Sequence, residues 1–382
     1  MSNVSAHDPR TATRPADRTA RPVGEVLSSW PTARFLFRFD EGTKALLAVT
    51  AVFLALCLIF STVLFIGGRD IYFNFTPKPP KVESSGGVAS EKGDFPYADG
   101  ASGNVLLPWA DKVDIISADS IYSAHAALAD LSTGEIIASR KADEIIYPAS
   151  MTKVMTLIVV VENLPSEDCL QDEITVSQAV YDAMKAEGSS GIGMAAGEKL
   201  TVESLLYALM LKSDGIAACE LARYVAGSEE DFVELMNQKA EKMGLSNTHF
   251  ENPTGLHHPD HKTTAREIAS IMAYAMNMKL CRKVLLTQSY TAPCVGADGA
   301  KFNYNLYHNL IVTKFDEIPV NQPNVVKVAA GKTGFTNEAR YCLVTYAESA
   351  DGHGYVCVTA EGDSYNACIA DYITIYNAYA KP

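Results

Sequence analysis

A long uncharged segment divides this chain of 382 residues into parts that must fold in different environments. Residues 45–66 carry no charged side chain and are rich in Leu, Val, Phe and Ile. As one helix they would extend about 33 Å, enough to cross the hydrocarbon core of a bilayer. A buried core helix and a cleaved signal peptide are the alternatives, but a signal peptide has a shorter apolar core and a shorter leader. We therefore predict a transmembrane helix over 45–66.

The flanking residues predict an orientation and further boundaries. Arg34, Arg38 and Lys44 stand just before the apolar segment, which favours a cytoplasmic N-terminus and an exported C-terminal part. Residues 1–44 are expected to form a disordered cytoplasmic tail. Residues 67–118, with several prolines and a Ser-Ser-Gly-Gly run, are expected to be a tether. The remaining residues, 119–382, are expected to form one globular domain.

The pattern of apolar residues predicts the order of elements in that domain. Runs typical of strands cover 124–130, 135–139, 325–330, 340–347 and 354–360. Apolar residues at helical spacing cover 150–162, 202–211, 216–226, 229–243, 264–276 and 367–380. Strands at both ends with helices between them predict one sheet built from distant segments, with a helical cluster inserted between those segments.

Charge and cysteine content exclude some classes and leave one question open. The net charge of −13 argues against a nucleic-acid-binding surface. Eight cysteines are present, without a C-x-x-C motif or a zinc-binding spacing. Cys342 and Cys357 lie on two apolar runs on either side of a turn, so a cross-strand disulfide is one interpretation. Small buried core residues are the interpretation that we favour.

Ser150 and Lys153 form an S-x-x-K motif where a helix is expected to begin. There the Ser150 hydroxyl would lie beside free backbone N–H groups and the positive end of the helix dipole, which favour an oxyanion. Lys153 lies one turn further on and could take the serine proton if burial or a second cation kept it neutral. Taken alone, the motif is better explained as a helix N-cap followed by a surface lysine.

Ser213 opens a second motif, Ser213-Asp214-Gly215, between two expected helices. Its hydroxyl could bridge Lys153 and a leaving nitrogen, passing a proton on. It could also serve as a helix N-cap, and the two roles are compatible.

Lys332, Thr333 and Gly334 form a third motif after an expected strand. Lys332 is the candidate second cation, and Lys332 with Thr333 offers a charge and a hydroxyl to a carboxylate. Gly334 would permit the close approach of an extended peptide backbone. A turn would explain this tripeptide alone, but it would not explain the order of the three motifs.

Together the motifs resemble the signature of active-site-serine enzymes that attack D-Ala-D-Ala or β-lactams. From residue 124 to residue 378 the chain resembles the serine-type D-Ala-D-Ala carboxypeptidases, which are low-molecular-mass penicillin-binding proteins. The resemblance extends to the stretches 147–153, 196–203, 252–256 and 331–336. It implies an α/β fold of the α+β type: an antiparallel sheet flanked by helices, with a mostly helical subdomain. Many members also carry a C-terminal β-rich domain and an amphipathic anchor helix. Here we expect no such domain, and an anchor at the N-terminal segment.

The resemblance also implies roles for individual residues. Ser150 would be the acylated nucleophile and Lys153 its general base. Ser213 would relay the proton, and Lys332 with Thr333 would hold the substrate carboxylate. The backbone N–H groups of Ser150 and Phe335 would form the oxyanion hole. No cofactor and no metal is implied.

Gly215 departs from the family pattern, which usually has Asn as the third residue of the second motif. That amide would contact the substrate and the lysine, so we place Gly215 with the substrate-binding residues and expect Gly215→Asn to equal or exceed the native activity. His257, His258, Asp260 and His261 crowd together as a metal site might, but Pro259 argues against a regular helix there, and we do not assign a metal.

The predicted protein is thus a single-pass membrane D,D-carboxypeptidase with its catalytic domain outside the cell. Its substrates would be peptidoglycan stem peptides ending in D-Ala-D-Ala, with β-lactams as inhibitors and no nucleic-acid partner. Two alternatives remain. One is a β-lactamase of the same fold, although no E-x-x-L-N-like segment lies between Ser213 and Lys332. The other is a non-catalytic sensor or scaffold that binds peptidoglycan or penicillin. Gly215, in place of the usual Asn, favours this alternative.

Overall fold

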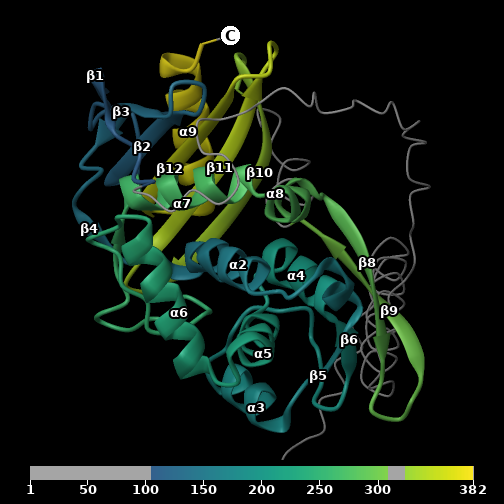
Figure 1. Cartoon of the computed structure of the whole chain (residues 1–382). Coiled ribbons are helices and arrows are strands. Elements are labelled where there is room, and N and C mark those ends of the chain that lie inside the picture. Colours follow the sequence, from purple (N-terminus) through teal and green to yellow (C-terminus); the bar gives the residue numbers. More distant parts are fainter. Residues whose placement is uncertain (1–104, 309–322, 382) are drawn as a thin grey trace, which may run out of the picture. The chain divides into compact units, whose positions relative to one another are not determined.

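One six-stranded sheet joins the beginning and the end of the folded part of the chain (Figure 1). The computed structural model describes residues 105–308 and 323–381. The strand order is β1-β3-β2-β12-β11-β10, in which β1 and β3 are parallel and all other neighbours are antiparallel. The strands are β1 (Trp109–Ile115), β2 (His125–Asp130), β3 (Glu135–Arg140), β10 (Val326–Thr336), β11 (Arg340–Ser349) and β12 (Gly354–Gly362). Because β2 pairs with β12, the prediction of a sheet from distant segments is confirmed.

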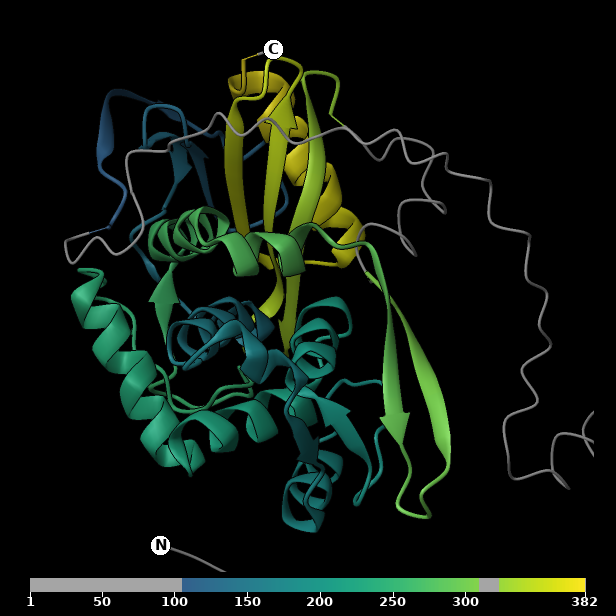
Figure 2. The same cartoon turned by 45° about the vertical axis from the view of Figure 1, so that its right-hand side comes forward.

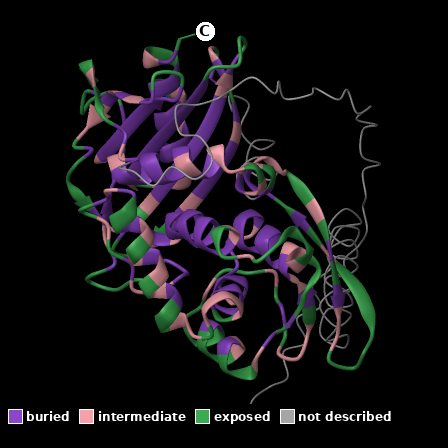
Figure 3. Ribbon diagram, viewed as in Figure 1, coloured by how far each residue is buried: buried purple, intermediate pink, exposed green. Residues whose placement is uncertain are grey.

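Helices cover both faces of this sheet. Helix α9 (Tyr365–Tyr379) packs on one face, where Ile369, Tyr372 and Tyr376 are buried. Helix α7 (Ala265–Asn277) packs across the other face (Figure 2). Strand β2 is accordingly buried along its whole length, as expected for a strand that is covered on both sides (Figure 3).

The inserted region consists mainly of helices, most of which begin at a side-chain cap. They are α2 (Lys153–Glu162), α3 (Gln178–Ala186), α4 (Val202–Leu211), α5 (Gly215–Ala226), α6 (Glu229–Lys242) and α8 (Lys279–Leu286). Ser177, Thr201, Asp214 and Ser228 each accept a backbone N–H at the start of the helix that follows. The boundaries predicted for α4, α5 and α6 agree with the structure to within one residue.

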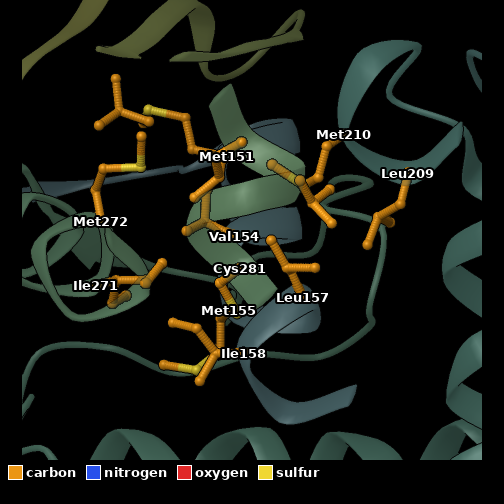
Figure 4. Close-up of a cluster of buried hydrophobic side chains, with 14 of the residues drawn as sticks. Met151, Val154, Met155, Leu157, Ile158, Leu209, Met210, Ile271, Met272 and Cys281 are labelled. Atoms are coloured by element: carbon orange, nitrogen blue, oxygen red, sulfur yellow. The ribbon is translucent and has the colours of Figure 1, made fainter. Parts of the chain in front are cut away.

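Helix α2 lies at the centre of the largest apolar cluster (Figure 4). Its residues from Lys153 to Val160 are all buried, which leaves no solvent-facing stripe in the body of the helix. The side chains around it come from α4, α7 and α8, among them Leu209, Met210, Ile271, Met272 and Cys281. A helix so enclosed holds the residues at its N-terminus in fixed positions.

The sequence pattern did not predict a second, four-stranded antiparallel sheet at the side of the inserted region. Its strands are β5 (Glu173–Thr175), β6 (Lys199–Thr201), β8 (Ser289–Val295) and β9 (Lys301–Tyr307), in this order. Two residues of β4 (Ile145–Ile146) also pair with β7 (Thr263–Thr264). Strands as short as β5 and β6 show too little alternation to be recognised in a sequence.

One expectation about the first third of the chain changes, and two others lie outside the described residues. The tether expected over 67–118 overlaps β1, which pairs with β3, so the folded unit begins before residue 119. The tail at 1–44 and the apolar segment 45–66 lie outside the described residues. Within the described residues, each helix is too short or too polar to traverse a bilayer.

The suggested disulfide between Cys342 and Cys357 is not formed. Cys342 lies opposite Gly334 on β10, whereas Cys357 lies opposite Thr345, so the two thiols are out of register. They also belong to different apolar clusters, on opposite faces of the sheet. All seven cysteines of the described residues are unpaired, and six of them are buried.

Candidate active site

Ser150 stands in a short 3-10 turn, Ala149–Thr152, directly before α2. Ala149 has a φ of 46°, a conformation that costs a residue with a side chain some energy and that recurs at functional sites. The helix caps on either side of Ser150 are Pro148 and Thr152, and neither makes a side-chain cap hydrogen bond. The interpretation of Ser150 as an N-cap is therefore wrong.

Two glycines, on two different segments of the chain, allow those segments to approach the backbone at Ser150 closely. A Cβ on Gly334 of β10 would lie 2.9 Å from the Pro148 carbonyl oxygen and 3.2 Å from the Ser150 nitrogen. A Cβ on Gly255, which has a φ of 79°, would collide with the Ala149 carbonyl group. Glycine is thus required at both positions, and the Lys-Thr-Gly strand lies directly against the turn that carries Ser150.

Lys153 is buried and reaches the serine from the first turn of α2. Its Nζ lies 3.2 Å from Ser150 Oγ and donates to the Thr254 carbonyl oxygen at 2.5 Å. Burial lowers the pKa of Lys153 to about 8, against the opposing influence of Cys219 and Asp214. A minor but substantial fraction of Lys153 is therefore neutral near physiological pH, the state in which Nζ can accept a proton.

The loop that carries Thr254 was recognised in the sequence only through its resemblance to the family. Asn252 orders this loop: its Oδ1 accepts the N–H of Gly255 at 2.7 Å and the hydroxyl of Thr254 at 2.8 Å. Its Nδ2 donates to the Leu256 carbonyl at 3.0 Å. Because a backbone carbonyl carries no sequence signal, the contact between Thr254 and Lys153 could not be predicted from residue types.

Lys332 joins the second motif to the third. Its Nζ donates to Ser213 Oγ at 2.9 Å and to the Thr333 carbonyl at 2.7 Å. Burial, and then the charge of Lys153, lower the pKa of Lys332 well below its usual range. Ser213 Oγ thus accepts a hydrogen bond from Lys332, and its bridge to Lys153 stays a prediction. The expected proximity of the two lysines is confirmed.

Asp214 and Gly215 fix a neighbouring loop. Asp214 is the N-cap of α5, and its second carboxylate oxygen accepts the N–H of Ile192 at 2.6 Å. Gly215 donates its N–H to the Ser190 carbonyl at 2.9 Å. A Cβ on Gly215 would collide with the Ser189 hydroxyl and lie 3.0 Å from Met184 Sδ. The glycine is buried, and a side chain at this position would have to displace Ser189. The effect of Gly215→Asn on activity stays a prediction.

Thr333 and Phe335 lie on the same strand as Lys332, with the opposite orientation to it. Thr333 is partly buried, and its side chain hydrogen-bonds with Tyr365 of α9. Phe335 is 45% exposed and packs on Tyr341, with their ring centroids 4.6 Å apart. Among the described residues β10 is the edge strand of its sheet, a position at which an extended peptide can add to a sheet.

Two buried histidines support the site, and the sequence did not reveal their roles. His261 Nδ1 accepts the Glu251 N–H at 3.2 Å, so its other nitrogen carries the proton and donates to Thr152 Oγ1 at 2.8 Å. Burial lowers the pKa of His261 to about 3, so the ring stays neutral. His261 thereby fixes the residue that precedes Lys153.

His308 directly follows β9 and lies beside Lys332. Its Nε2 donates to the Gly331 carbonyl at 3.1 Å. Burial, followed by the charges of Lys332 and Lys212, lowers the pKa of His308 to about 4. The ring is therefore neutral and adds no third cation next to the buried lysines.

The histidine-rich loop does not assemble the four side chains that suggested a metal. His261 is engaged with Thr152, while His257 packs edge-on against Tyr147. Within the described residues, Glu251, His258 and Asp260 each bring one ligand atom within 4.8 Å of the others, but all three are exposed. Exposed groups of this kind are common without an ion, and we assign no site to them.

The fold and the site define a class of protein: one in which an active-site serine at the start of a buried helix is contacted by a lysine of its own turn. Residues 112–361 match the family model described as D-alanyl-D-alanine carboxypeptidase, and the chain belongs to that family.

Several known proteins are similar to this chain. The D-alanyl-D-alanine carboxypeptidase DacF of Bacillus subtilis is 32% identical over 233 residues, which cover 59% of this chain and 54% of that protein. The D-alanyl-D-alanine carboxypeptidase of Streptomyces sp. strain K15 is 31% identical over 251 residues, 64% of this chain and 82% of that protein. Among solved structures, the Streptomyces K15 DD-transpeptidase superposes with a TM-score of 0.62 at 28% identity, covering 69% of this chain and 98% of that one. The match to DacC of Escherichia coli, 36% identical, covers 40% of this chain and 39% of that protein.

Proposed function

We propose that this chain is a serine-type D,D-carboxypeptidase that removes the terminal D-alanine from peptidoglycan stem peptides and is acylated by β-lactams. The observation that carries the proposal is the convergence of the three motifs. Lys153 contacts Ser150, Lys332 contacts Ser213, and Gly334 lies against the Ser150 turn. The named activities of the relatives support the same reaction.

In the proposed acylation, Ser150 Oγ attacks the carbonyl carbon between the two D-alanines while neutral Lys153 takes the hydroxyl proton. The N–H groups of Ser150 and Phe335 donate to the developing oxyanion. The C–N bond then breaks, and the proton returns to the leaving amine through Ser213, which Lys332 orients. Water finally attacks the ester carbonyl and gives a proton to Lys153, which passes it to Ser150 Oγ as the ester C–O bond breaks and the shortened peptide leaves as its carboxylate.

Substrate binding has its own group of residues in this proposal. The terminal carboxylate would meet Lys332 and Thr333 while the peptide backbone lies along β10. A carboxylate beside Lys332 favours the charged form of that buried lysine, so binding would take up a proton when Lys332 is neutral beforehand.

The test combines D-Ala release with mass spectrometry of the penicillin-treated protein. We expect release of D-Ala from a D-Ala-D-Ala peptide and a penicillin adduct on Ser150, both absent in Ser150→Ala. The exposed Ser166 offers a matched control, since Ser166→Ala should keep both. An adduct without D-Ala release would favour the sensor, rapid nitrocefin turnover would favour the β-lactamase, and an adduct on another side chain would contradict the site.

We also propose that residues 45–66 anchor the protein in the cell membrane, with the N-terminus in the cytoplasm and the catalytic unit outside. The support is the uncharged 22-residue length of the segment and the basic residues that precede it. The full chain should stay in the membrane fraction after a carbonate wash, and protease added to spheroplasts should digest the catalytic unit. Recovery of the full chain in the wash would refute the anchor.

A further inference from the structure

The loop over residues 251–261 belongs to none of the three motifs, yet it contacts the buried first turns of α2. Lys153 Nζ donates to the Thr254 carbonyl oxygen at 2.5 Å. One turn further on, the hydroxyl of Thr156 donates to the Pro253 carbonyl oxygen at 2.7 Å. Lys153 and Thr156 are both buried, so these contacts are made inside the core. The direction of two successive loop carbonyls therefore decides where the lysine amine is held.

A single side chain, that of Asn252, fixes the direction of these carbonyls. Its Oδ1 accepts the N–H of Thr254 at 3.1 Å, the hydroxyl of Thr254 at 2.8 Å and the N–H of Gly255 at 2.7 Å. Its Nδ2 donates to the Leu256 carbonyl at 3.0 Å. An asparagine that bonds the backbone of the residues after it stabilises a tight turn.

The peptide group that joins Thr254 to Gly255 is consequently held at both ends. Asn252 accepts its N–H, and Lys153 donates to its carbonyl oxygen. Because this peptide bond is trans, its N–H and C=O point in opposite directions. The hydrogen bond to Asn252 thus turns the negative end of the peptide dipole towards Lys153.

The position of this carbonyl affects the lysine in two ways. A neutral amine has two N–H groups and one lone pair, and an N–H that donates to Thr254 leaves the lone pair free to face Ser150 Oγ, 3.2 Å from Nζ. The carbonyl is also an acceptor for the ammonium form, and it favours that form. Loss of the carbonyl would therefore misdirect the base and lower the pKa of Lys153.

We propose that Asn252 is a positioning residue of the proposed carboxypeptidase, because it orients the peptide group that directs the lone pair of Lys153 at Ser150. The inference rests on the proposed function, in which neutral Lys153 takes the serine proton. Asn252 should accordingly set both the maximal rate of acylation and the pH at which half of that rate is reached.

Other groups also act on Lys153, and each belongs to a different part of the site. Asp214 and Cys219 face it from the start and the body of α5, and Lys332 faces it from β10. His261 lies at the end of the loop and is neutral. All four groups are retained when residue 252 is replaced.

The experiment measures penicillin acylation of the full-length protein in detergent as a function of pH. In Asn252→Ala the plateau rate should fall about 10- to 100-fold, as for a base displaced by up to about one ångström. The midpoint should move to lower pH, because the ammonium form loses its acceptor. Asn252→Asp keeps an acceptor for the same three donors, which favour its carboxylate form. It should recover most of the plateau rate, and its negative charge should move the midpoint to higher pH.

Asn237 offers a matched control at the other end of the loop. Its amide exchanges two hydrogen bonds with the backbone of Phe250, at 2.8 and 2.9 Å. Asn237→Ala should lower the melting temperature and leave the midpoint of the pH profile unchanged.

The outcomes separate this inference from the proposed function. Native midpoints in both Asn252 variants, or midpoints that move in the same direction, would overturn the role of Asn252 and leave the carboxypeptidase intact. If Asn252→Ala does not fold, Asn252→Asp decides, since a native midpoint in that variant overturns the inference. If the native protein forms no penicillin adduct on Ser150, the proposed function fails and this inference fails with it.

Discussion

Lys153 and Lys332 are two buried lysines that approach the same small group of hydroxyls, one through Ser150 and the other through Ser213. Burial disfavours the ammonium form of each, and the charge of Lys153 adds to the effect at Lys332. The structure thus provides a lysine base for Ser150. Among the hydrogen bonds of the described residues, none joins a histidine to the Ser150 hydroxyl. The chemical requirement for a neutral lysine is met by its position in the core.

This position predicts the pH dependence of acylation. Below pH 8 Lys153 is mostly protonated and cannot take the Ser150 proton, whereas above pH 8 it is mostly neutral. The second-order rate of penicillin acylation should therefore rise with pH and level off, with an apparent pKa of about 8. Stopped-flow measurements between about pH 6 and 10 would test this. A flat profile would mean that Lys153 is not the base.

Gly215 predicts a stability effect at a single residue. Gly215→Ala should lower the free energy of unfolding by about 1–3 kcal/mol, because the new methyl group meets the Ser189 hydroxyl. Removing that hydroxyl and its Cβ in the double variant Gly215→Ala/Ser189→Gly should restore part of the loss, beyond the sum of the single effects. Urea unfolding of the four proteins measures the coupling. Additive effects would show that the two residues do not compete for space.

At the scale of elements, strand β10 is longer than the sequence pattern predicts, because pairing with its neighbour extends it. The strand was predicted over 325–330, since the segment 331–336 contains two glycines and has the composition of a turn. In the structure β10 continues to Thr336, because every residue from Gly331 to Thr336 has a partner on β11. Pairing along β11 outweighs local propensity there, and it carries Lys332 and Gly334 to the serine.

The contact between β10 and the serine turn predicts a kinetic effect. Gly334→Ala should push the strand away from Pro148 and Ser150, and a displacement of a few tenths of an ångström up to one ångström should lower penicillin acylation by about 10²-fold. The melting temperature should change little, because the strand can shift at the edge of the sheet. Unchanged acylation in a folded Gly334→Ala protein would show that this approach is not needed.

The elements that were predicted well are those whose signals are local. Helix α4 begins at Thr201, a capping residue, and ends where its apolar run ends, and both features are visible in the sequence. By contrast, β9 alternates Phe302, Tyr304 and Leu306 with two asparagines, a strand pattern that the sequence prediction missed, and its pairing with β8 is visible only in the structure. The three motifs were predicted as a site, but the Lys332–Ser213 pairing and the support from His261 and His308 come from tertiary contacts.

At the scale of the whole folded unit, we expect the C-terminal helix to be as necessary for activity as the three motifs, because it covers one face of the sheet. Helix α9 contains none of the three motifs, yet it covers one face of the sheet with Tyr372, Ile375 and Tyr376. Its Asp371 also accepts the backbone N–H groups of Tyr122 and Ser123, both at 2.8 Å. The two ends of the described unit are thereby joined across a face of the sheet.

A protein truncated after Gly362 should therefore lose penicillin binding, although every motif residue is retained. The exposed apolar face should also abolish a single cooperative unfolding transition and increase the binding of a hydrophobic dye. As a control, Lys381→Ala changes an exposed residue beyond α9 and should keep both properties. A truncated protein that still forms the Ser150 adduct would show that the motifs assemble without α9.

The unpaired cysteines have a practical consequence. Because the described unit carries no covalent cross-link, its production does not require an oxidising compartment or an isomerase, and reducing agents should leave its activity intact. Of its seven thiols, Cys169 is the one that is not buried. A maleimide dye applied to the native unit should therefore attach at Cys169 alone, which gives a single reporter position for fluorescence without any engineering of the sequence.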